Sequence, residues 1–322
     1  MSVLVYTEFE NGKFKKNAHE VASYAYEVAN KMGTSVTAVA INANSPETLG
    51  DYGVTKVINV QNEDLKTFNA KAYANTIAQV SAKENATIII LSSSADTKFL
   101  APMLTAQLKA GYVPNVVAAP ESTSPFQVKR TVFSNKGFAI TELDTDIKII
   151  GVSNNAFGSV ENRTDATVED FAPELTEGAF ATKSIEIDKV VGKATIADAD
   201  IVVSGGRGLK GPENWGMVEE LAEVLGAATA CSKPVSDLGW RPHGEHVGQT
   251  GKPVASNLYI AIGISGAIQH LAGVSASKVK VVINTDPEAP FFKAADYGVV
   301  GDAFEVVPQL IEKLKEFKAQ NA

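Results

Sequence analysis

The stretch 258-LYIAIGISGAIQHLAG-273 decides the fold that we expect for this chain. Leu258 to Ile264 is an apolar run of strand length, and Ser265 and Gly266 follow it directly, before a short amphipathic stretch. This order predicts a strand, a tight turn and the start of a helix. We expect the hydroxyl of Ser265 to cap that helix, and Gly266 to let a ligand approach the backbone closely. The N–H groups at such a helix start favour phosphate or another anion.

An ordinary turn of an α/β domain would show the same pattern, so the neighbouring sequence has to distinguish the two interpretations. Residues 200–206 predict a second strand that leads into a helix at 212–226. Between them, Gly206, Gly208 and Gly211 match the dinucleotide-binding pattern G-x-G-x-x-G.

That pattern normally comes with an acidic residue at the end of the next strand, where it binds a ribose hydroxyl. Here the next strand, 227–231, ends in Ser232 and Lys233. The sequence therefore disfavours a standard NAD-binding half, but it still predicts a seat for a phosphate group.

Upstream, strands and helices alternate with short connections, which is typical of a parallel sheet covered on both faces. Residues 110–165 predict a hairpin or a mixed sheet edge. Residues 165–200 are polar and lack periodicity, so we expect a linker there, with a domain boundary between 185 and 200. The expected strands are 2–7, 35–41, 56–60 and 87–94, and the expected helices are 18–31, 45–51, 69–84 and 97–109.

The composition is that of a globular protein. With 322 residues, two α/β domains are expected, and 45% hydrophobic with 20% charged residues is ordinary for soluble domains. The net charge of −8 argues against nucleic acid as a partner. The single cysteine, Cys231, excludes an internal disulfide and favours a reducing compartment. The apolar runs are too short to span a bilayer and no targeting segment is recognisable, so we expect a cytoplasmic location without membrane insertion.

The loops at the expected carboxyl ends of the C-terminal strands are rich in cations, imidazoles and hydroxyls, although the whole chain is acidic. In an open α/β sheet these loops line the ligand crevice. They predict a phosphate-bearing ligand whose reactive part becomes negatively charged. The groups concerned are Arg207, Lys210, Lys233, Arg241, Lys252, His243, His246, His270, Ser232, Thr250 and Ser265.

Several residues of this region have simpler explanations. Lys210 and Arg241 are expected to be solvated, and Cys231 to be packed at the end of its strand. The pair His243 and His246 lacks further metal ligands nearby, so no zinc site is expected. Both tryptophans are expected in the core or at an interface rather than against a cofactor ring.

Six motifs follow one another in unbroken order over about 201 to 310. They are GRGLKGPEN (206–214), CSKPVSDLGW (231–240), VGQTGK (247–252), LYIAIGISGAIQH (258–270), VINTDPEAP (282–290) and ADYGVVGDAFEVVP (295–308). With these motifs the chain resembles the C-terminal FAD domain of the electron transfer flavoprotein alpha subunit, in its bacterial form. The resemblance implies an N-terminal domain, 1–190, with a nucleotide-binding-like parallel-sheet α/β fold that contacts a beta subunit. It also implies a Rossmann-like FAD-binding α/β domain at 191–322.

The resemblance further implies a heterodimer with that beta subunit and one FAD. Electrons would pass from flavin dehydrogenases, such as the acyl-CoA dehydrogenases of fatty acid beta-oxidation, to a quinone oxidoreductase or another acceptor. Such a protein is an electron carrier without catalytic residues or a metal of its own. Two other interpretations stay open. One is an FAD- or NAD-dependent oxidoreductase that acts directly on a small molecule through His270 and Asp237, and the other is an interaction module whose nucleotide is purely structural.

By matching motif positions, the resemblance assigns a set of FAD contacts. Thr250 would offer a hydroxyl to flavin N5, while His270 and the helix start at Ser265 would stabilise charge on the N1 and C2 side of the ring. Asn284 and Asp302 would hold the AMP half of the cofactor. The complete set is Arg207, Ser232, Lys233, Val247, Gly248, Gln249, Thr250, Ser265, Gly266, Ala267, Ile268, Gln269, His270, Asn284 and Asp302.

The sequence departs from the family pattern at two places. Lys233 stands where an arginine usually lies beside the flavin ring. Lysine keeps the charge but loses the planar stacking surface, so we expect the half-reduced flavin to be less stabilised or tuned differently. The segment VSNNAF at 152–157 lacks the arginine that commonly precedes Ala-Phe, which affects any interface built on that arginine.

Overall fold

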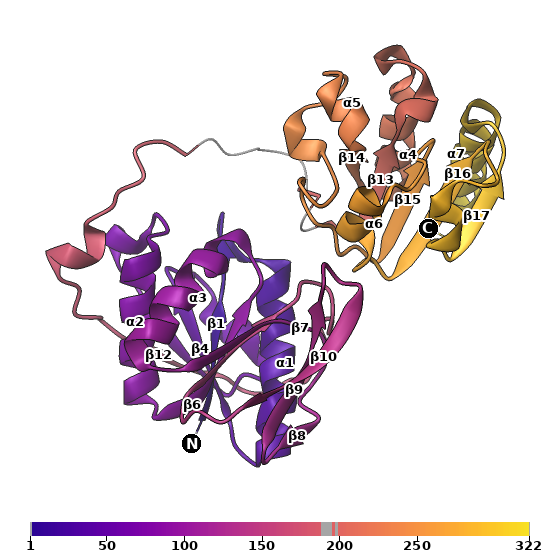
Figure 1. The fold of residues 1–322 in the computed structure, drawn as a ribbon. Coiled ribbons are helices and arrows are strands. Elements are labelled where there is room, and N and C mark those ends of the chain that lie inside the picture. The colour runs from indigo at the N-terminus through magenta and orange to yellow at the C-terminus, as the bar shows by residue number, and fades with distance from the viewer. Residues whose placement is uncertain (1, 188–194, 197–198, 322) are drawn as a thin grey trace. The chain divides into compact units, whose positions relative to one another are not determined.

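The structure of the chain is a computed structural model that describes residues 2–187, 195–196 and 199–321. The chain divides into two compact units, one built mainly from the residues up to 188 and the other mainly from the residues after it. In Figure 1 the first unit is coloured from indigo to magenta and the second from orange-red to yellow. The expected boundary between residues 190 and 191 lies outside the described residues.

The described part of the N-terminal unit is built on a ten-stranded sheet (Figure 1). The strands from β7 to β12 along the sheet pair in parallel, whereas β8, β9 and β10 form an antiparallel edge. In spatial order the sheet contains β10 (Gly137–Leu143), β9 (Phe126–Val132), β7 (Gly111–Val116), β11 (Lys148–Val152), β6 (Ala86–Ser92), β1 (Ser2–Thr7), β4 (Val36–Ile41), β5 (Lys56–Val60) and β12 (Thr167–Asp170), with β8 (Ser122–Thr123) beside β9.

Helices cover both faces of this sheet. Alternate residues of each buried strand point to opposite sides, so the sheet has an apolar face on each side. On β1, Val3 and Val5 belong to the core beneath α1, whereas Leu4 and Tyr6 belong to the core beneath α2 and α3. The helices are α1 (Lys16–Met32), α2 (Ala70–Lys83) and α3 (Ala95–Leu108), and a small hairpin of β2 (Phe9–Glu10) and β3 (Lys13–Phe14) precedes α1.

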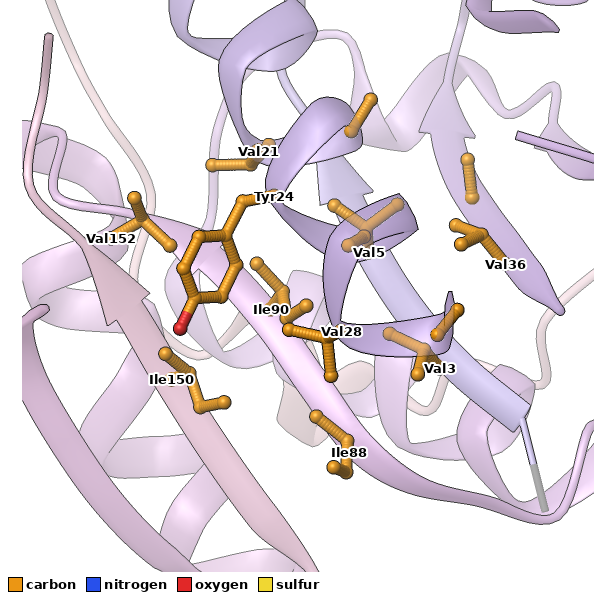
Figure 2. Close-up of a cluster of buried hydrophobic side chains, with 14 of the residues drawn as sticks. Val3, Val5, Val21, Tyr24, Val28, Val36, Ile88, Ile90, Ile150 and Val152 are labelled. Carbon is orange, nitrogen blue, oxygen red and sulfur yellow. The ribbon is translucent and has the colours of Figure 1, made fainter. Parts of the chain in front are cut away.

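Figure 2 shows the core on the α1 side. Val21, Tyr24 and Val28 extend from α1 toward the sheet, where they meet side chains such as Ile90 of β6 and Ile150 of β11. All five side chains are at most 1% exposed. The three helical positions recur every three or four residues, which is the spacing that places them on one face.

The elements expected up to residue 109 are confirmed, with one exception. Residues Pro46–Asp51 form a 3-10 turn rather than an α-helix. Gly33 ends α1 in the left-handed conformation, with φ of 64°, as its position predicted. The hairpin expected within 110–165 is also confirmed, as β9 and β10.

The expected linker starts later than the sequence indicated. Residues 167–170 form β12, which pairs in parallel with β5, and a 3-10 turn at Glu177–Phe180 buries Ala179 in the core beneath α2. The prediction of a linker is therefore wrong for 167–180. This edge strand shows no apolar alternation because backbone hydrogen bonds hold it, together with ion pairs from Glu169 to Lys56 and Lys83.

The described part of the C-terminal unit contains a five-stranded sheet in which all strands are parallel (Figure 1). The chain starts in β13, moves outward to β14 and then returns to the other side of β13 as β15. This reversal makes the gap between the carboxyl ends of β13 and β15 the topological switch point, where open α/β sheets place their ligands. The spatial order is β14 (Ala228–Cys231), β13 (Ile201–Gly205), β15 (Leu258–Ile262), β16 (Val279–Asn284) and β17 (Tyr297–Val300).

Helices also cover both faces of the second sheet. The core on one face includes residues of α4, α5 and α7, and the core on the other includes residues of α6. The helix expected at 212–226 begins as a 3-10 turn, Pro212–Asn214, before α4 starts. None of the described helices is long and apolar enough to cross a membrane. Their bounds are α4 (Gly216–Leu225), α5 (Lys233–Asp237), α6 (Ile268–Val274) and α7 (Ala303–Gln320).

Ile90→Ala is expected to lower the free energy of unfolding of the N-terminal unit by about 2–5 kcal/mol, because Ile90 is completely buried and its truncation leaves a cavity. The matched control is Ile140→Ala on β10, where the side chain is 47% exposed and the expected change is within about 0.5 kcal/mol. Urea unfolding followed by circular dichroism measures both values. Equal losses in the two variants would contradict the assignment of Ile90 to the core.

Candidate functional site

The carboxyl ends of β13 and β15 meet through a contact between glycine backbones. The Gly208 N–H donates to the Gly263 carbonyl at 3.0 Å. A Cβ atom on Gly206 would lie 2.1 Å from the Gly263 oxygen, and one on Gly208 would lie 2.7 Å from the Gly263 Cα. No side chain fits at either position. The contact therefore brings the loop that carries Arg207 against the loop that carries Ser265.

A second glycine pair joins the loop before β15 to α6. A Cβ atom on Gly273 of α6 would lie 2.6 Å from the Gly248 Cα. Beside this contact, the Gln249 N–H donates to the Gln269 carbonyl at 2.7 Å. Two of the segments that the sequence assigned to FAD, 247–250 and the start of α6, thus lie side by side.

The end of β14 borders the same place. The Ser232 N–H donates to the Gly205 carbonyl at 3.1 Å, and the Val247 N–H donates to the Cys231 carbonyl at 3.0 Å. Ser232 is buried, and so is the Cys231 thiol, whose pKa is raised to about 12, mainly by burial. Cys231 is thus a packed residue, as expected.

The start of α6 differs from the expectation. Ala267, not Ser265, is the N-cap residue, and no side chain caps the helix. Ser265 is exposed and its carbonyl accepts a hydrogen bond from the Phe291 N–H at 3.0 Å. Gly266 has φ of 85°, and a Cβ there would lie 2.5 Å from the Phe291 nitrogen. The predicted cap is wrong because this left-handed glycine adds a turn between the strand and the helix.

His270 lies in the first turn of α6 and is 6% exposed. Its Nε2 atom is 3.0 Å from the hydroxyl of Tyr259, while its Nδ1 atom is buried without a hydrogen-bond partner. Burial, and next the neighbouring His246, lower the pKa of His270 from 6.5 to about 4. The imidazole is therefore neutral at pH 7 and acts as a hydrogen-bonding group rather than as a fixed cation.

Three further buried polar atoms of this unit lack a partner among the described residues. They are the Ser204 hydroxyl of β13, Nδ1 of His246 and Nε1 of Trp215. Burial, followed by His243 and Lys233, lowers the pKa of His246. Buried polar groups are normally hydrogen-bonded, so the unpaired atoms of Ser204 and the two histidines fit a polar cofactor that supplies the missing partners.

The expected cations differ in their surroundings. Lys233 is exposed, and its Nζ lies 2.9 Å from both carboxylate oxygens of Asp237. Arg241 was expected to be solvated, but its guanidinium is largely buried, forms ion pairs with Glu219 and Glu245, and stacks over Trp215. The prediction for Arg241 is wrong because these two carboxylates and the ring compensate for its desolvation. Trp215 itself is a core residue, as expected.

Asn284 and Asp302 have structural partners in this chain. Nδ2 of Asn284 donates to the Ile264 carbonyl at 3.1 Å, which ties the end of β16 to the loop after β15. Asp302 caps α7 by accepting a hydrogen bond from the Phe304 N–H at 3.0 Å, and its other oxygen lies 4.0 Å from Nζ of Lys210. Lys210 is exposed, as expected. Its Nζ also lies over the Phe304 ring.

Of the remaining residues assigned to FAD, Arg207, Thr250, Ile268 and Gln269 are exposed at the rim of these loops. Sequence reasoning missed Tyr259 and Ser204. Both lie inside apolar strands, where a polar side chain that is buried needs a partner. That conflict was the signal that could have identified them.

A doubly wound parallel sheet whose glycine-rich loops meet at the switch point is the arrangement with which open α/β domains hold nucleotide-type cofactors. Residues 195–275 match the family model described as the electron transfer flavoprotein FAD-binding domain, and residues 3–176 match the electron transfer flavoprotein domain. The chain belongs to the electron transfer flavoprotein alpha subunit family, and its cofactor is FAD.

Similar curated proteins carry the same name. The chain is 35% identical to the electron transfer flavoprotein subunit alpha of Bacillus subtilis, over 98% of this chain and 97% of the relative. It is 35% identical to the subunit from Thermoanaerobacterium thermosaccharolyticum, over 98% of each chain. The subunit from Syntrophomonas wolfei is 34% identical, over 97% of this chain and 98% of the relative.

Gly263→Ala is expected to weaken FAD binding and to destabilise the C-terminal unit by more than about 2 kcal/mol. Its φ of 62° disfavours a side chain, and the new Cβ would lie 2.9 Å from the Gly208 Cα. Gly226→Ala is the matched control, because its φ is 66° but no atom lies within 4 Å of the added Cβ. We expect that control to cost about 1 kcal/mol and to keep FAD. Fluorescence titration with FAD and urea unfolding test this, and equal effects of both variants would contradict the role of the close contact.

His270 is expected to make the stability of the C-terminal unit depend on pH. The unfolded chain binds a proton at this imidazole below pH 6.5, whereas the folded chain resists until about pH 4. Stability should therefore fall as the pH drops from 6.5 to 4, by up to about 3 kcal/mol, and this contribution should level off below pH 4. His270→Gln should remove this part of the slope.

Urea unfolding at several pH values between 7 and 4 measures how the free energy of unfolding depends on pH in the wild type, in His270→Gln and in a control variant. The same substitution at His243, an exposed imidazole, serves as the control. A slope that His270→Gln leaves unchanged would contradict the burial of a neutral imidazole.

Proposed function

We propose that the chain is the FAD-carrying subunit of a heterodimeric electron carrier. It accepts electrons from flavin dehydrogenases, such as the acyl-CoA dehydrogenases of fatty acid beta-oxidation, and passes them to a quinone oxidoreductase or another acceptor. The observation that carries this proposal is the meeting of 247–250 with the start of α6, next to the glycine contact at the switch point. Membership of the alpha subunit family supports a partner subunit.

FAD, when bound, supplies redox chemistry in one-electron and two-electron steps. We assign its ring to the residues around Ser232, Lys233, 247–250 and 265–270. The AMP half is assigned to the side of Asn284 and Asp302, and Arg207 to the rim between the two parts. This division rests on the loops that the strands bring together at their carboxyl ends.

The groups assigned to the flavin ring favour negative charge at the ring edge mainly through neutral donors. The first N–H groups of α6 have no partners within the helix, and the neutral His270 adds an imidazole that is already buried. Lys233 adds the positive charge of a side chain that Asp237 partly offsets. Neutral, preorganised donors need little rearrangement when charge develops, which suits a protein that passes electrons on.

The alternative of an oxidoreductase with its own small substrate needs an acid–base group beside an open pocket. The two candidates for that role are engaged elsewhere. Asp237 is bound to Lys233, and His270 is buried against Tyr259. These contacts favour a carrier without a dedicated substrate.

We further propose that 1–190 forms the domain that contacts the beta subunit and that 191–322 forms the FAD domain.

The segment 152–157, which lacks the usual arginine, is held by hydrogen bonds within the N-terminal unit. The buried carboxylate of Glu20 accepts hydrogen bonds from the N–H groups of Asn155, Phe157 and Gly158 at 2.7–2.9 Å. The cytoplasmic location stays a prediction.

Lys233→Ala is expected to lower the midpoint potential of the bound FAD by on the order of tens of millivolts, because a nearby positive charge favours the reduced, more negative cofactor. Lys233→Arg keeps the charge and should retain the potential more closely. A spectroelectrochemical titration of the heterodimer measures all three proteins. An unchanged potential in Lys233→Ala would place this side chain away from the ring.

The proposed function is tested by producing the chain together with its beta subunit and mixing the purified complex with a reduced acyl-CoA dehydrogenase under anaerobic conditions. The expected result is one FAD per heterodimer that is reduced by the dehydrogenase and reoxidised by a quinone oxidoreductase. A complex whose FAD accepts electrons from no flavin dehydrogenase would contradict the proposal.

A further inference from the structure

Tyr259 of β15 is a polar residue at the centre of an apolar layer. Its side chain is completely buried, and its ring stacks on Phe291 with an interplanar angle of 4°. The hydroxyl lies 3.0 Å from Nε2 of His270 and close enough to Ser204 for the serine to affect the pKa of the phenol. Burial raises that pKa well above 10, so the phenol stays protonated and available as a donor.

The direction of the Tyr259 to His270 hydrogen bond follows from the donors and acceptors around it. If the phenol donates to Nε2, its proton has an acceptor 3.0 Å away. If Nε2 donates instead, the phenol proton has no acceptor among the described residues, because the Ser204 hydroxyl forms no hydrogen bond there. The first arrangement leaves the N–H at Nδ1 unpaired, whereas the second leaves both the phenol proton and the lone pair of Nδ1 unpaired.

The Nδ1 atom of His270 is the unpaired side of the imidazole. It is buried and forms no hydrogen bond in the described structure. A proton on Nδ1 therefore has no acceptor among the described residues, and a bound cofactor could supply one.

We propose that Tyr259 is a positioning residue for His270: its hydroxyl donates to Nε2, holds the neutral imidazole proton on Nδ1, and so leaves a buried N–H that donates to FAD. The tyrosine itself does not touch the cofactor in this scheme. The step that involves FAD rests on the proposed placement of the ring beside His270. The tautomer of His270 does not depend on that placement.

The test compares the wild type with Tyr259→Phe in the full chain bound to its beta subunit. Phenylalanine keeps the ring that stacks on Phe291 and removes only the hydroxyl. With histidines labelled with ¹⁵N, nuclear magnetic resonance distinguishes a protonated from an unprotonated ring nitrogen, and His270→Gln identifies the signals by their loss. We expect the wild type to carry the proton on Nδ1 and Tyr259→Phe to populate the other tautomer.

A second measurement follows FAD. If only the Nδ1-protonated form donates to the cofactor, the dissociation constant should rise by the inverse of the fraction of that form, roughly twofold to tenfold in Tyr259→Phe. Tyr24→Phe is the matched control, since it removes a completely buried hydroxyl that donates to the Ala118 carbonyl in the other unit. It should change neither the His270 signals nor FAD binding.

Two results would overturn the inference. One is a wild-type His270 that carries its proton on Nε2, which needs no variant to detect. The other is a Tyr259→Phe protein in which the nitrogen signals of His270 are unchanged. A complex that binds no FAD at all would instead contradict the proposed function, while the nitrogen signals would still decide the role of Tyr259.

Discussion

The contact of Gly263 with Gly206 and Gly208 sets the position of the other parts of the site. It joins the ends of the two strands between which the order of the sheet reverses. Any side chain at these glycines would push the loops apart by the width of a methyl group. Glycine costs conformational entropy on folding, roughly 0.5–1 kcal/mol per position in regular structure, and these loops carry that cost at several positions. The arrangement of the loops therefore depends on the absence of side chains as much as on the groups that the loops carry.

Three polar side chains of the C-terminal unit, those of Ser204, Tyr259 and His270, are buried. Tyr259 belongs to a core cluster whose other members are mainly aliphatic, and Ser204 and His270 each have a polar atom without a partner in the described structure. An unpaired buried group costs about 1–3 kcal/mol, so an apolar layer would be more stable. The balance changes if these side chains serve the cofactor, since satisfied polar networks in a low-dielectric interior are strong and well ordered. His270 then acts as a neutral donor whose proton Tyr259 holds on Nδ1.

Much of the fold could be predicted from the sequence because its strands and helices carry clear periodicities and end in clear signals. Gly33 is an example, since a glycine after an amphipathic run predicts the end of α1. The edge strand β12 could not be predicted, because backbone pairing and ion pairs hold it. At the site, the family motifs predicted the segments that meet, but the cap at Ser265 and the surroundings of Arg241 were wrong. Both depend on residues distant in sequence, Phe291 in one case and Glu219 in the other. The role of Tyr259 likewise becomes visible only when the register of β15 and α6 is known.

The central claim is that FAD lies at the switch point between β13 and β15. An experimental structure of the heterodimer with bound FAD tests it most directly. The account predicts density for the isoalloxazine ring beside the loop 247–250 and the start of α6, with His270 within hydrogen-bond distance of the ring. A ring bound at the N-terminal sheet, or separated from His270 by other side chains, would contradict the account.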